Sequence, residues 1–257
     1  MQFELEAKKS LGQNFLKNTT IIQKMVDSCV KIATKDTIVL EIGPGTGALT
    51  EYILKTGLET IAIEADDRAI PLLTEKFKEN KNFTLIHEDV RVFDISNIKK
   101  PYILLANIPY YLTGYITRKF LESENQPKAM IIMVQKEVAL RINDKKSSLA
   151  SLGIHTYGTP RILTHVSKGN FVPAPKVDSS VLVVENIQRD LFPNKELEAT
   201  YWELAKKGFG NKRKQLGGTA LKGTTHAELT QYLKKRPEDL QVEDWVKIAK
   251  IYTEIGK

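Results

Sequence analysis

The chain is predicted to fold as an α/β protein with a mostly parallel sheet, one antiparallel strand near the end of that sheet, and a small C-terminal all-helical domain. Two features of the 257-residue sequence indicate this. Up to residue 189, short apolar runs alternate with amphipathic stretches, as in βαβ units whose helices cover both faces of a sheet. From residue 190 onward the apolar spacing is helical only. We therefore predict one domain at 1–189 and a helical domain at 190–257.

The predicted elements follow in a regular order. Apolar residues at helical spacing indicate a first helix at 21–33, and a β-branched run that stops at a glycine-rich turn follows it as the first strand. The predicted strands are 37–42, 59–64, 83–87, 102–106 and 128–134, and the helices that alternate with them are 48–55, 67–80, 117–122 and 136–142. This alternation predicts a Rossmann-like sheet, because parallel strands need crossover connections.

The end of the sheet is predicted around the proline-rich segment FVPAPKVD, which separates the runs 161–166 and 179–185. We expect these two runs to form a closing antiparallel pair. The remaining elements are predicted to be helices at 196–207, 215–221, 226–235 and 242–255.

The charge distribution favours a polyanionic partner. Lys and Arg exceed Asp and Glu by 38 to 31, and the segments 145–177 and 206–222 contain no acidic residue at all. Either segment alone could be a solvated loop, but two such segments together favour contact with the phosphates of a nucleic acid. The candidate contacts in the second segment are Lys206, Lys207, Lys212, Arg213 and Lys214.

Several classes of protein are disfavoured by composition. Cys29 is the only cysteine, so an intrachain disulfide is impossible, and the four histidines lack metal-ligand spacing. We predict no metal site. The longest apolar run, 129–134, is too short to span a bilayer. We therefore expect a cytoplasmic protein without membrane contact, with a monomer as the default state.

The glycine-rich turn in IVLEIGPGTGALT joins the first strand to a helix, so that backbone N–H groups and a helix N-terminus face a ligand. Gly43 and Gly45 form this turn. The pattern alone describes dinucleotide enzymes equally well. Glu64 ends the second strand, where a carboxylate can accept both hydroxyls of an unphosphorylated ribose. Taken singly, Glu64 could also be a carboxylate whose negative charge is stabilised by the dipole of the following helix.

The third strand ends in His87-Glu88-Asp89-Val90. Asp89 offers a carboxylate to the amino group of an adenine, and Val90 offers a backbone N–H to the ring, although Asp89 alone could be a turn former. Together with Glu64 these residues describe a pocket for an adenosine with a charged amino-acid tail. S-adenosylmethionine fits better than NAD, so the predicted sheet is that of a class I S-adenosylmethionine-dependent methyltransferase.

A second motif, Asn107-Ile108-Pro109-Tyr110, follows the buried run 102–106. The Asn107 side-chain oxygen and the Ile108 carbonyl can accept hydrogen bonds from an exocyclic amine, Pro109 makes the turn rigid, and Tyr110 offers a ring face for stacking. In isolation the tetrapeptide is more simply a proline turn that ends a strand. Beside a cofactor pocket it indicates methylation of the amine of a nucleobase.

Motifs along almost the whole chain resemble one family, the small-subunit ribosomal RNA adenine N6-dimethyltransferases of the KsgA type. The matching segments are KKSLGQNFL at 8–16, VLEIGPGTGALT at 39–50, IAIEADDRA at 61–69, HEDV at 87–90, LLANIPYYLTG at 104–114, MVQKEVALRI at 133–142, FVPAPKVDSSVL at 171–182 and GNKRKQL at 210–216. One departure is Ile108, where that family more often has leucine; the residue acts through its backbone.

The resemblance implies further roles. Asn14, Leu16 and Asn107 would line the S-adenosylmethionine pocket together with Gly43, Glu64 and Asp89, and Gln13 would lie nearby as a further cofactor-binding residue. Tyr110 and Phe171 would sandwich the target adenine, and the helical domain would bind ribosomal RNA. The implied substrate is a pair of adjacent adenosines in the 3′-terminal hairpin loop of small-subunit rRNA, methylated within a pre-ribosomal particle during small-subunit maturation.

Other functions remain open at this point. The erythromycin-resistance methyltransferases, which act on large-subunit rRNA, share the NIPY motif. Three other segments, LGQNFL, the basic KRK turn and PEDLQVEDWVKIA, resemble the small-subunit group more closely. A dehydrogenase would leave NIPY without a purpose. A non-catalytic RNA-binding assembly factor would leave the cofactor pocket idle, and a DNA adenine methyltransferase would not need the GQNFL arm or the helical tail.

Overall fold

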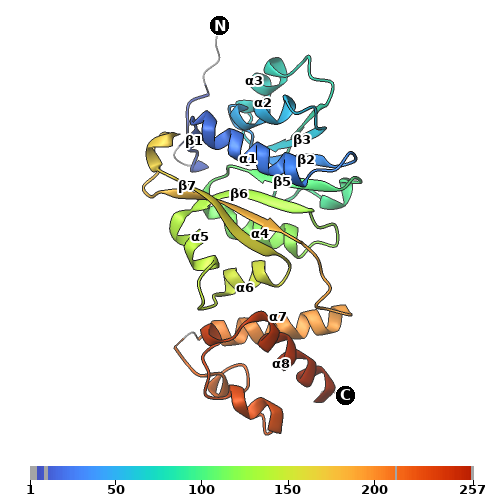
Figure 1. The fold of residues 1–257 in the computed structure, drawn as a ribbon, viewed down its shortest axis with the longest axis vertical. Helices are drawn as coiled ribbons and strands as arrows, with labels where there is room; N and C mark the ends of the chain where they lie inside the picture. Colours follow the sequence, from blue (N-terminus) through green and yellow to red (C-terminus); the bar gives the residue numbers. More distant parts are fainter. Residues whose placement is uncertain (1–4, 9–10, 212, 256–257) are drawn as a thin grey trace. The chain divides into compact units, whose positions relative to one another are not determined.

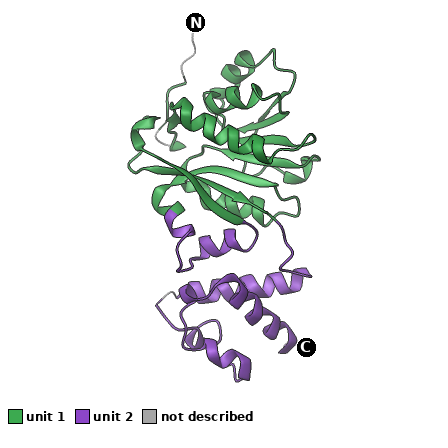
Figure 2. Ribbon diagram, in the orientation of Figure 1, with its two compact units in different colours: residues 1–139, 159–187 green, residues 140–158, 188–257 purple. Residues whose placement is uncertain are grey.

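A computed structural model describes residues 5–8, 11–211 and 213–255 (Figure 1). The chain divides into two compact units (Figure 2). The first contains residues 1–139 and 159–187, and the second contains residues 140–158 and 188–257. Each unit has its own hydrophobic core.

The first unit is built on a seven-stranded sheet with the order β4-β3-β2-β5-β6-β9-β7. Its strands are β2 (Ile38–Ile42), β3 (Thr60–Glu64), β4 (Phe83–His87), β5 (Tyr102–Ala106), β6 (Ala129–Gln135), β7 (Thr159–Val166) and β9 (Ser179–Glu185). The strands β2 to β6 pair in parallel, whereas β9 runs antiparallel to both of its neighbours, β6 and β7. The predicted sheet with one antiparallel strand near its end is therefore confirmed, as is the closing pair around FVPAPKVD.

Helices cover both faces of this sheet (Figure 1). They are α1 (Thr19–Ile32), α2 (Ala48–Leu54), α3 (Ala69–Lys76), α4 (Thr113–Leu121) and α5 (Lys136–Ile142). The helix α1 begins after Asn18, whose side chain accepts hydrogen bonds from the Thr20 and Ile21 N–H groups. Its apolar face, which includes Met25 and the buried Cys29, packs on the sheet. The sequence pattern thus forms the expected amphipathic helix.

Two short elements of the first unit were not predicted. The strands β1 (Phe15–Leu16) and β8 (Phe171–Val172) pair antiparallel as a separate two-stranded sheet. Two residues are too few to show any periodicity, so only the folded chain reveals this pairing. It ties the N-terminal arm to the segment that follows β7 and the short helix η4 (Lys168–Asn170).

The second unit contains α6 (Leu149–His155), α7 (Lys195–Phe209) and α8 (Val242–Ile255). The predicted helices at 215–221 and 226–235 are wrong, because that region forms only the 3₁₀ segments η5 (Leu216–Gly218), η6 (Ala227–Tyr232) and η7 (Pro237–Asp239). Three glycines between 217 and 223 disfavour an α-helix in the first of these stretches. Trp245, which is fully buried, anchors the core that these segments enclose.

The unpredicted helix α6 joins this helical core. Leu152 belongs to the hydrophobic cluster of the second unit, and the Thr156 hydroxyl lies 2.6 Å from the Tyr201 hydroxyl of α7. The second unit therefore takes residues 140–158 from within the range that was assigned to the catalytic domain, while its later part begins at 188, close to the expected boundary. The assignment of catalysis to 1–189 and of RNA binding to 190–257 stays a prediction.

Two glycines with positive φ give a test of packing around the glycine-rich turn. At Gly47 (φ +73°) an added Cβ would lie 2.7 Å from Phe77 Cε2, whereas at Gly57 (φ +80°) it would meet nothing within 4 Å. Both alanine variants incur left-handed strain of about 1–2 kcal/mol, and Gly47→Ala adds an overpacking cost of about 1–3 kcal/mol. Urea unfolding should show the larger loss of stability for Gly47→Ala. Equal losses would contradict the packing seen here.

Candidate active site

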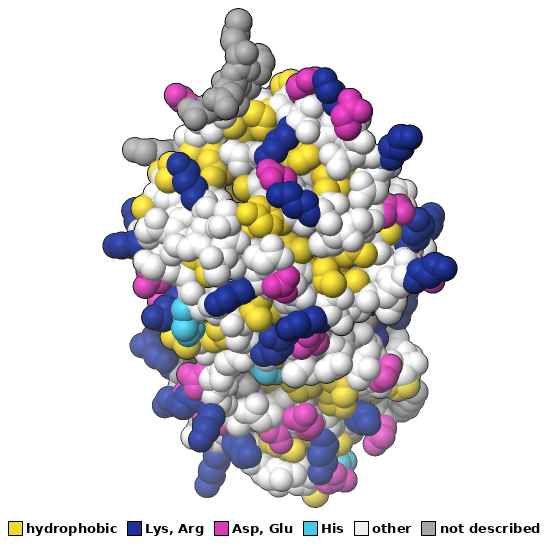
Figure 3. All heavy atoms as spheres, turned by 45° about the horizontal axis from the view of Figure 1, so that its top comes forward, with side chains coloured by type: hydrophobic (Ala, Val, Ile, Leu, Met, Phe, Trp, Pro, Cys, Tyr) yellow, Lys and Arg dark blue, Asp and Glu magenta, His cyan; other side chains and the backbone are white. Residues whose placement is uncertain are grey.

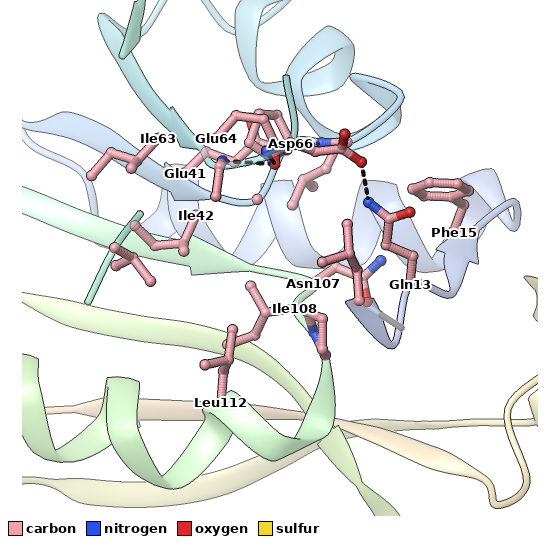
Figure 4. A pocket seen from close by; sticks show the side chains of 18 of the residues that line it. Gln13, Phe15, Glu41, Ile42, Ile63, Glu64, Asp66, Asn107, Ile108 and Leu112 are labelled. Carbon is pink, nitrogen blue, oxygen red and sulfur yellow. Dashed lines mark hydrogen bonds between the residues drawn. The ribbon is translucent and has the colours of Figure 1, made fainter. Parts of the chain in front are cut away.

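A pocket opens at the carboxyl ends of β2, β3, β4 and β5 (Figure 4). Its walls come from the N-terminal arm, the glycine-rich turn, the end of β3, the loop after β4 and the turn after β5. Ligands of open parallel sheets bind at this edge. Of the predicted site residues, those that line the pocket are Gln13, Asn14, Leu16, Gly43, Gly45, Glu64, Asp89, Val90, Asn107, Ile108 and Pro109.

The buried carboxylate of Glu64 holds the glycine-rich turn against the end of β3. Its Oε2 accepts a hydrogen bond from the Gly45 N–H at 2.9 Å, and its Oε1 accepts bonds from the Ala65 and Asp66 N–H groups at 2.9 Å each. A carboxylate has about four acceptor sites, so these three bonds leave room for a further donor from a ligand. The position suits the predicted contact to ribose hydroxyls, and that contact stays a prediction.

Glu41, just before the glycines, is a pocket residue that was not assigned a role from the sequence. Its side chain is 1% exposed, and its Oε2 has no hydrogen-bond partner in the described part of the chain. Burial raises the pKa of this carboxyl to about 8. A buried acceptor without a partner on the pocket wall fits a ligand that carries positive charge, such as a sulfonium or an ammonium group. The available signal was an acidic residue inside an otherwise apolar strand.

Asp89 and Val90 lie in the loop after β4. The Arg91 guanidinium bonds the Asp89 carboxylate through Nε at 2.9 Å and Nη2 at 2.5 Å, and the Arg91 N–H bonds it at 2.8 Å. These hydrogen bonds lower the pKa of Asp89. The side chain is thus an ionised acceptor at the pocket wall, as recognition of an amino group requires.

The residues Asn107-Ile108-Pro109-Tyr110, here called the acceptor turn, only partly line this pocket. Asn107, Ile108 and Pro109 line the pocket, and Figure 4 shows Asn107 near Gln13. Tyr110 lies outside the lining and its hydroxyl is 2.6 Å from the Ser179 hydroxyl on β9. Phe171 is 3% exposed, belongs to the core of the sheet and also does not line the pocket. The predicted sandwich of the target adenine between these two rings stays a prediction.

The N-terminal arm closes one side of the pocket through a polar cluster. Gln13 Nε2 donates to Asp66 Oδ2 at 2.8 Å, and the Arg68 guanidinium donates to the same carboxylate at 2.6 and 2.9 Å (Figure 4). The Arg68 hydrogen bonds lower the pKa of Asp66 to about 2. Asp66 and Arg68 were not predicted as site residues, although the charged run EADDR, which begins at Glu64, was visible in the sequence.

The candidate RNA contacts lie in the second unit. Lys206 and Lys207 are exposed in the last turn of α7, where Lys207 pairs with Glu203 at 2.6 Å. Arg213 and Lys214 are exposed in the following turn, while Lys212 is outside the described residues. On the face shown in Figure 3, basic side chains are numerous and interspersed with acidic ones. RNA binding by these residues stays a prediction.

Two searches of the described residues gave negative results. No group of three or more His, Cys, Asp or Glu side chains that could hold a metal ion occurs among residues 5–8, 11–211 and 213–255. Within the same ranges, no helix is both long enough and apolar enough to cross a membrane.

Comparison with known proteins decides the family. The model of the family described as "Ribosomal RNA adenine dimethylase" matches residues 4–254. The chain belongs to this family. A curated relative from Dehalococcoides mccartyi, named "Ribosomal RNA small subunit methyltransferase A", is 36% identical over 98% of this chain and 90% of its own length.

Two solved structures support the fold of this dimethylase. A dimethyladenosine transferase from Plasmodium falciparum has a TM-score of 0.79 at 23% identity, covering 94% of this chain and 98% of its own. The 23S rRNA methyltransferase ErmE has a TM-score of 0.76 at 20% identity, covering 92% and 98%. At this level of identity the two structures inform on the fold alone.

Family membership confirms the predicted enzyme class. The protein is an rRNA adenine dimethyltransferase that uses S-adenosylmethionine, so the dehydrogenase, DNA methyltransferase and non-catalytic interpretations are set aside. Bound at this site, the cofactor supplies an electrophilic methyl group on a sulfonium. Gly43, Gly45, Glu64 and Asp89 line the pocket that would hold it, as does Glu41, and their contacts with the cofactor stay a prediction.

The raised pKa of Glu41 predicts a dependence of stability on pH. The folded protein keeps this proton up to about pH 8, whereas the unfolded chain loses it near its ordinary pKa of 4.5, so unfolding releases a proton between these values. Stability therefore falls as pH rises through this window, by at most about 1.4 kcal/mol per pH unit. In urea unfolding at pH 5, 6, 7 and 8, the free energy of unfolding of Glu41→Gln should increase relative to that of the wild type as pH rises. A difference that does not change with pH would contradict this.

The hydrogen bond between Tyr110 and Ser179 predicts a matched set of variants. Ser179→Ala and Tyr110→Phe each remove this bond without removing the ring, and each should lower turnover by about threefold to tenfold, the value of one hydrogen bond. The double variant should be no worse than either single one. Ser180→Ala is the control, because the Ser180 hydroxyl bonds His165 instead, at 2.8 Å. Additive losses in the double variant would argue against a shared role.

Proposed function

We propose that this dimethyltransferase methylates N6 of two adjacent adenosines in the 3′-terminal hairpin loop of small-subunit rRNA, within a pre-ribosomal particle. The observation that carries the proposal is the position of the motif Asn107-Ile108-Pro109-Tyr110, which follows β5 and contributes three residues to the lining of the cofactor pocket. Relatives named for the small ribosomal subunit, which match nearly the whole chain, support it.

The chemistry asked of the acceptor turn is positioning. The N6 lone pair of adenine is delocalised into the ring, so the amine is a poor nucleophile. Hydrogen bonds accepted by the Asn107 side chain and the Ile108 carbonyl favour the pyramidal amine and direct its lone pair toward the methyl group. Water takes the proton that is lost, since neither a metal nor a strong base is needed.

The target base must leave its stack to reach this turn. Unstacking costs a few kcal/mol and is least costly for loop nucleotides, while stacking on an aromatic ring returns about 1–3 kcal/mol per base. Tyr110 supplies such a ring next to Asn107. Phe171 is buried, so its proposed contact with the base requires its ring to become exposed when RNA binds.

The second candidate is methylation of large-subunit rRNA, because the erythromycin-resistance methyltransferases share the NIPY motif found at residues 107–110. The small-subunit substrate is better supported, because near full-length relatives at 34–36% identity carry that name. We further propose that the enzyme acts as a monomer in the cytoplasm, with the second unit contacting rRNA. Incubation with labelled cofactor and immature small-subunit or large-subunit particles tests the choice, and label in the large-subunit rRNA alone would overturn it.

Asn107→Ala tests the acceptor turn. The variant removes the acceptor for the amine and should lower turnover by at least about a hundredfold, the loss typical of an electrostatic positioning group. Cofactor binding, followed by calorimetry, should remain measurable because the other pocket contacts are intact. Asn97→Ala, in a distant turn of the same unit, is the control. Wild-type turnover in Asn107→Ala would refute the assigned role.

Salt dependence tests RNA binding by the second unit. Replacing Arg213 and Lys214 by alanine removes two exposed cations. If both contact phosphates, the slope of log K against log salt concentration should become less steep by about one unit per lost contact. Filter binding of a small-subunit rRNA hairpin from low to moderate salt measures this slope. An unchanged slope would exclude these two residues as phosphate contacts.

A further inference from the structure

One face of α4 holds the loop that follows β4. Lys119 Nζ donates hydrogen bonds to three carbonyl oxygens of this loop, those of Val90 at 2.8 Å, Arg91 at 3.0 Å and Phe93 at 2.6 Å. One helical turn earlier, the Tyr115 hydroxyl donates to the Arg91 carbonyl at 2.8 Å. Residues four apart lie on the same face of a helix, so both side chains reach the loop together.

The contacts of Lys119 use its whole hydrogen-bonding capacity. An ammonium group has three donors and no acceptor, and all three find a carbonyl oxygen here. Partial burial lowers the pKa of Lys119, while the nearby Glu88, Asp89 and Asp94 favour its charged form. A lysine on a surface helix gains such a set of partners only if the loop is folded around it.

The same loop forms the pocket wall. Its tight turn is closed by hydrogen bonds from the Val92 and Phe93 N–H groups to the Asp89 carbonyl, at 2.9 and 3.1 Å. Asp89 and Val90 line the pocket on one side of the loop, while the Val90 carbonyl is bound by Lys119 on the other. The orientation of the peptide after Val90 is therefore set from α4, which begins at Thr113, after the short 3₁₀ segment η3 (Tyr110–Leu112).

We propose that Lys119, assisted by Tyr115, is a positioning residue that fixes Asp89 and Val90 for recognition of the cofactor's adenine ring. This inference rests on the proposed placement of that ring against Asp89 and Val90. It adds a group on α4 that does not line the cofactor pocket. Discrimination at the adenine amino group then depends on this helix as well as on Asp89 and Val90.

The test compares two probes by calorimetry. S-adenosylhomocysteine carries the adenine amino group, and its deaminated analogue S-inosylhomocysteine carries an oxygen in its place. The full-length wild type should prefer the first. Lys119→Met should raise the Kd for S-adenosylhomocysteine by about tenfold and the Kd for the analogue by less, so that the ratio of the two Kd values moves closer to one. Lys119→Arg should restore most of the preference. In turnover, the KM for cofactor should rise while the KM for RNA stays the same.

Two further variants make the outcome decisive. Arg118→Met is the matched control, since its side chain on the next position of α4 is 69% exposed and pairs with Glu122 at 3.5 Å; it should bind both probes as the wild type does. Tyr115→Phe removes one bond to the loop and should move the ratio of the two Kd values in the same direction, by about threefold. It provides the readout if Lys119→Met does not fold.

The inference and the proposed function fail in different ways. If Asp89→Ala keeps the full preference for S-adenosylhomocysteine, the placement of adenine is wrong and the inference falls with it. If Asp89→Ala loses the preference while Lys119→Met and Tyr115→Phe keep it, adenine lies at Asp89 and only the role of α4 is overturned. An equal loss of affinity for both probes in Lys119→Met would likewise overturn it.

Discussion

The pocket depends on one buried interaction, the binding of three backbone N–H groups by the carboxylate of Glu64. One oxygen holds Gly45, and with it the glycine-rich turn. The other holds the peptides of Ala65 and Asp66, which orients the Asp66 side chain toward Gln13 and Arg68. Glu64, the last residue of β3, therefore positions the turn after β2 directly and the N-terminal arm through Asp66. Removing this carboxylate would leave two buried donors, the Gly45 and Asp66 N–H groups, without partners, a larger penalty than the loss of a surface contact.

The surroundings of the acidic side chains around the pocket give them different protonation states. Guanidinium partners lower the pKa of Asp66 and Asp89, whereas burial raises that of Glu41. A proton on Glu41 avoids a further negative charge in a confined space. A cationic cofactor reverses this balance, because a sulfonium nearby favours the ionised form of the same carboxyl. The pocket is in this way matched to a positively charged ligand through electrostatics as well as shape.

Several features of the sequence were informative because their signal is local. The short apolar runs that form β2, β3 and β5 are buried on both faces, and such runs are typical of central parallel strands. The helices in the region 215–235 were wrongly predicted because apolar residues such as Leu216, Leu229 and Tyr232 belong to 3₁₀ segments packed on α7 and α8, where burial rather than helical periodicity selects them. The β1–β8 pair had no local signal at all.

The sequence by itself determined the succession of strands and helices along the sheet domain, the glycine-rich turn, the acidic strand ends and the family, because each is encoded in a short stretch of residue types. Tertiary structure alone decided what those residues contact. It buried Phe171 outside the pocket lining, joined residues 140–158 to the helical unit, and set the burial of Glu41 and the hydrogen bonds of Asp66 and Lys119. The physical reason is that burial, hydrogen-bond partners and pKa depend on groups distant in the chain, which no local pattern of residue types can specify.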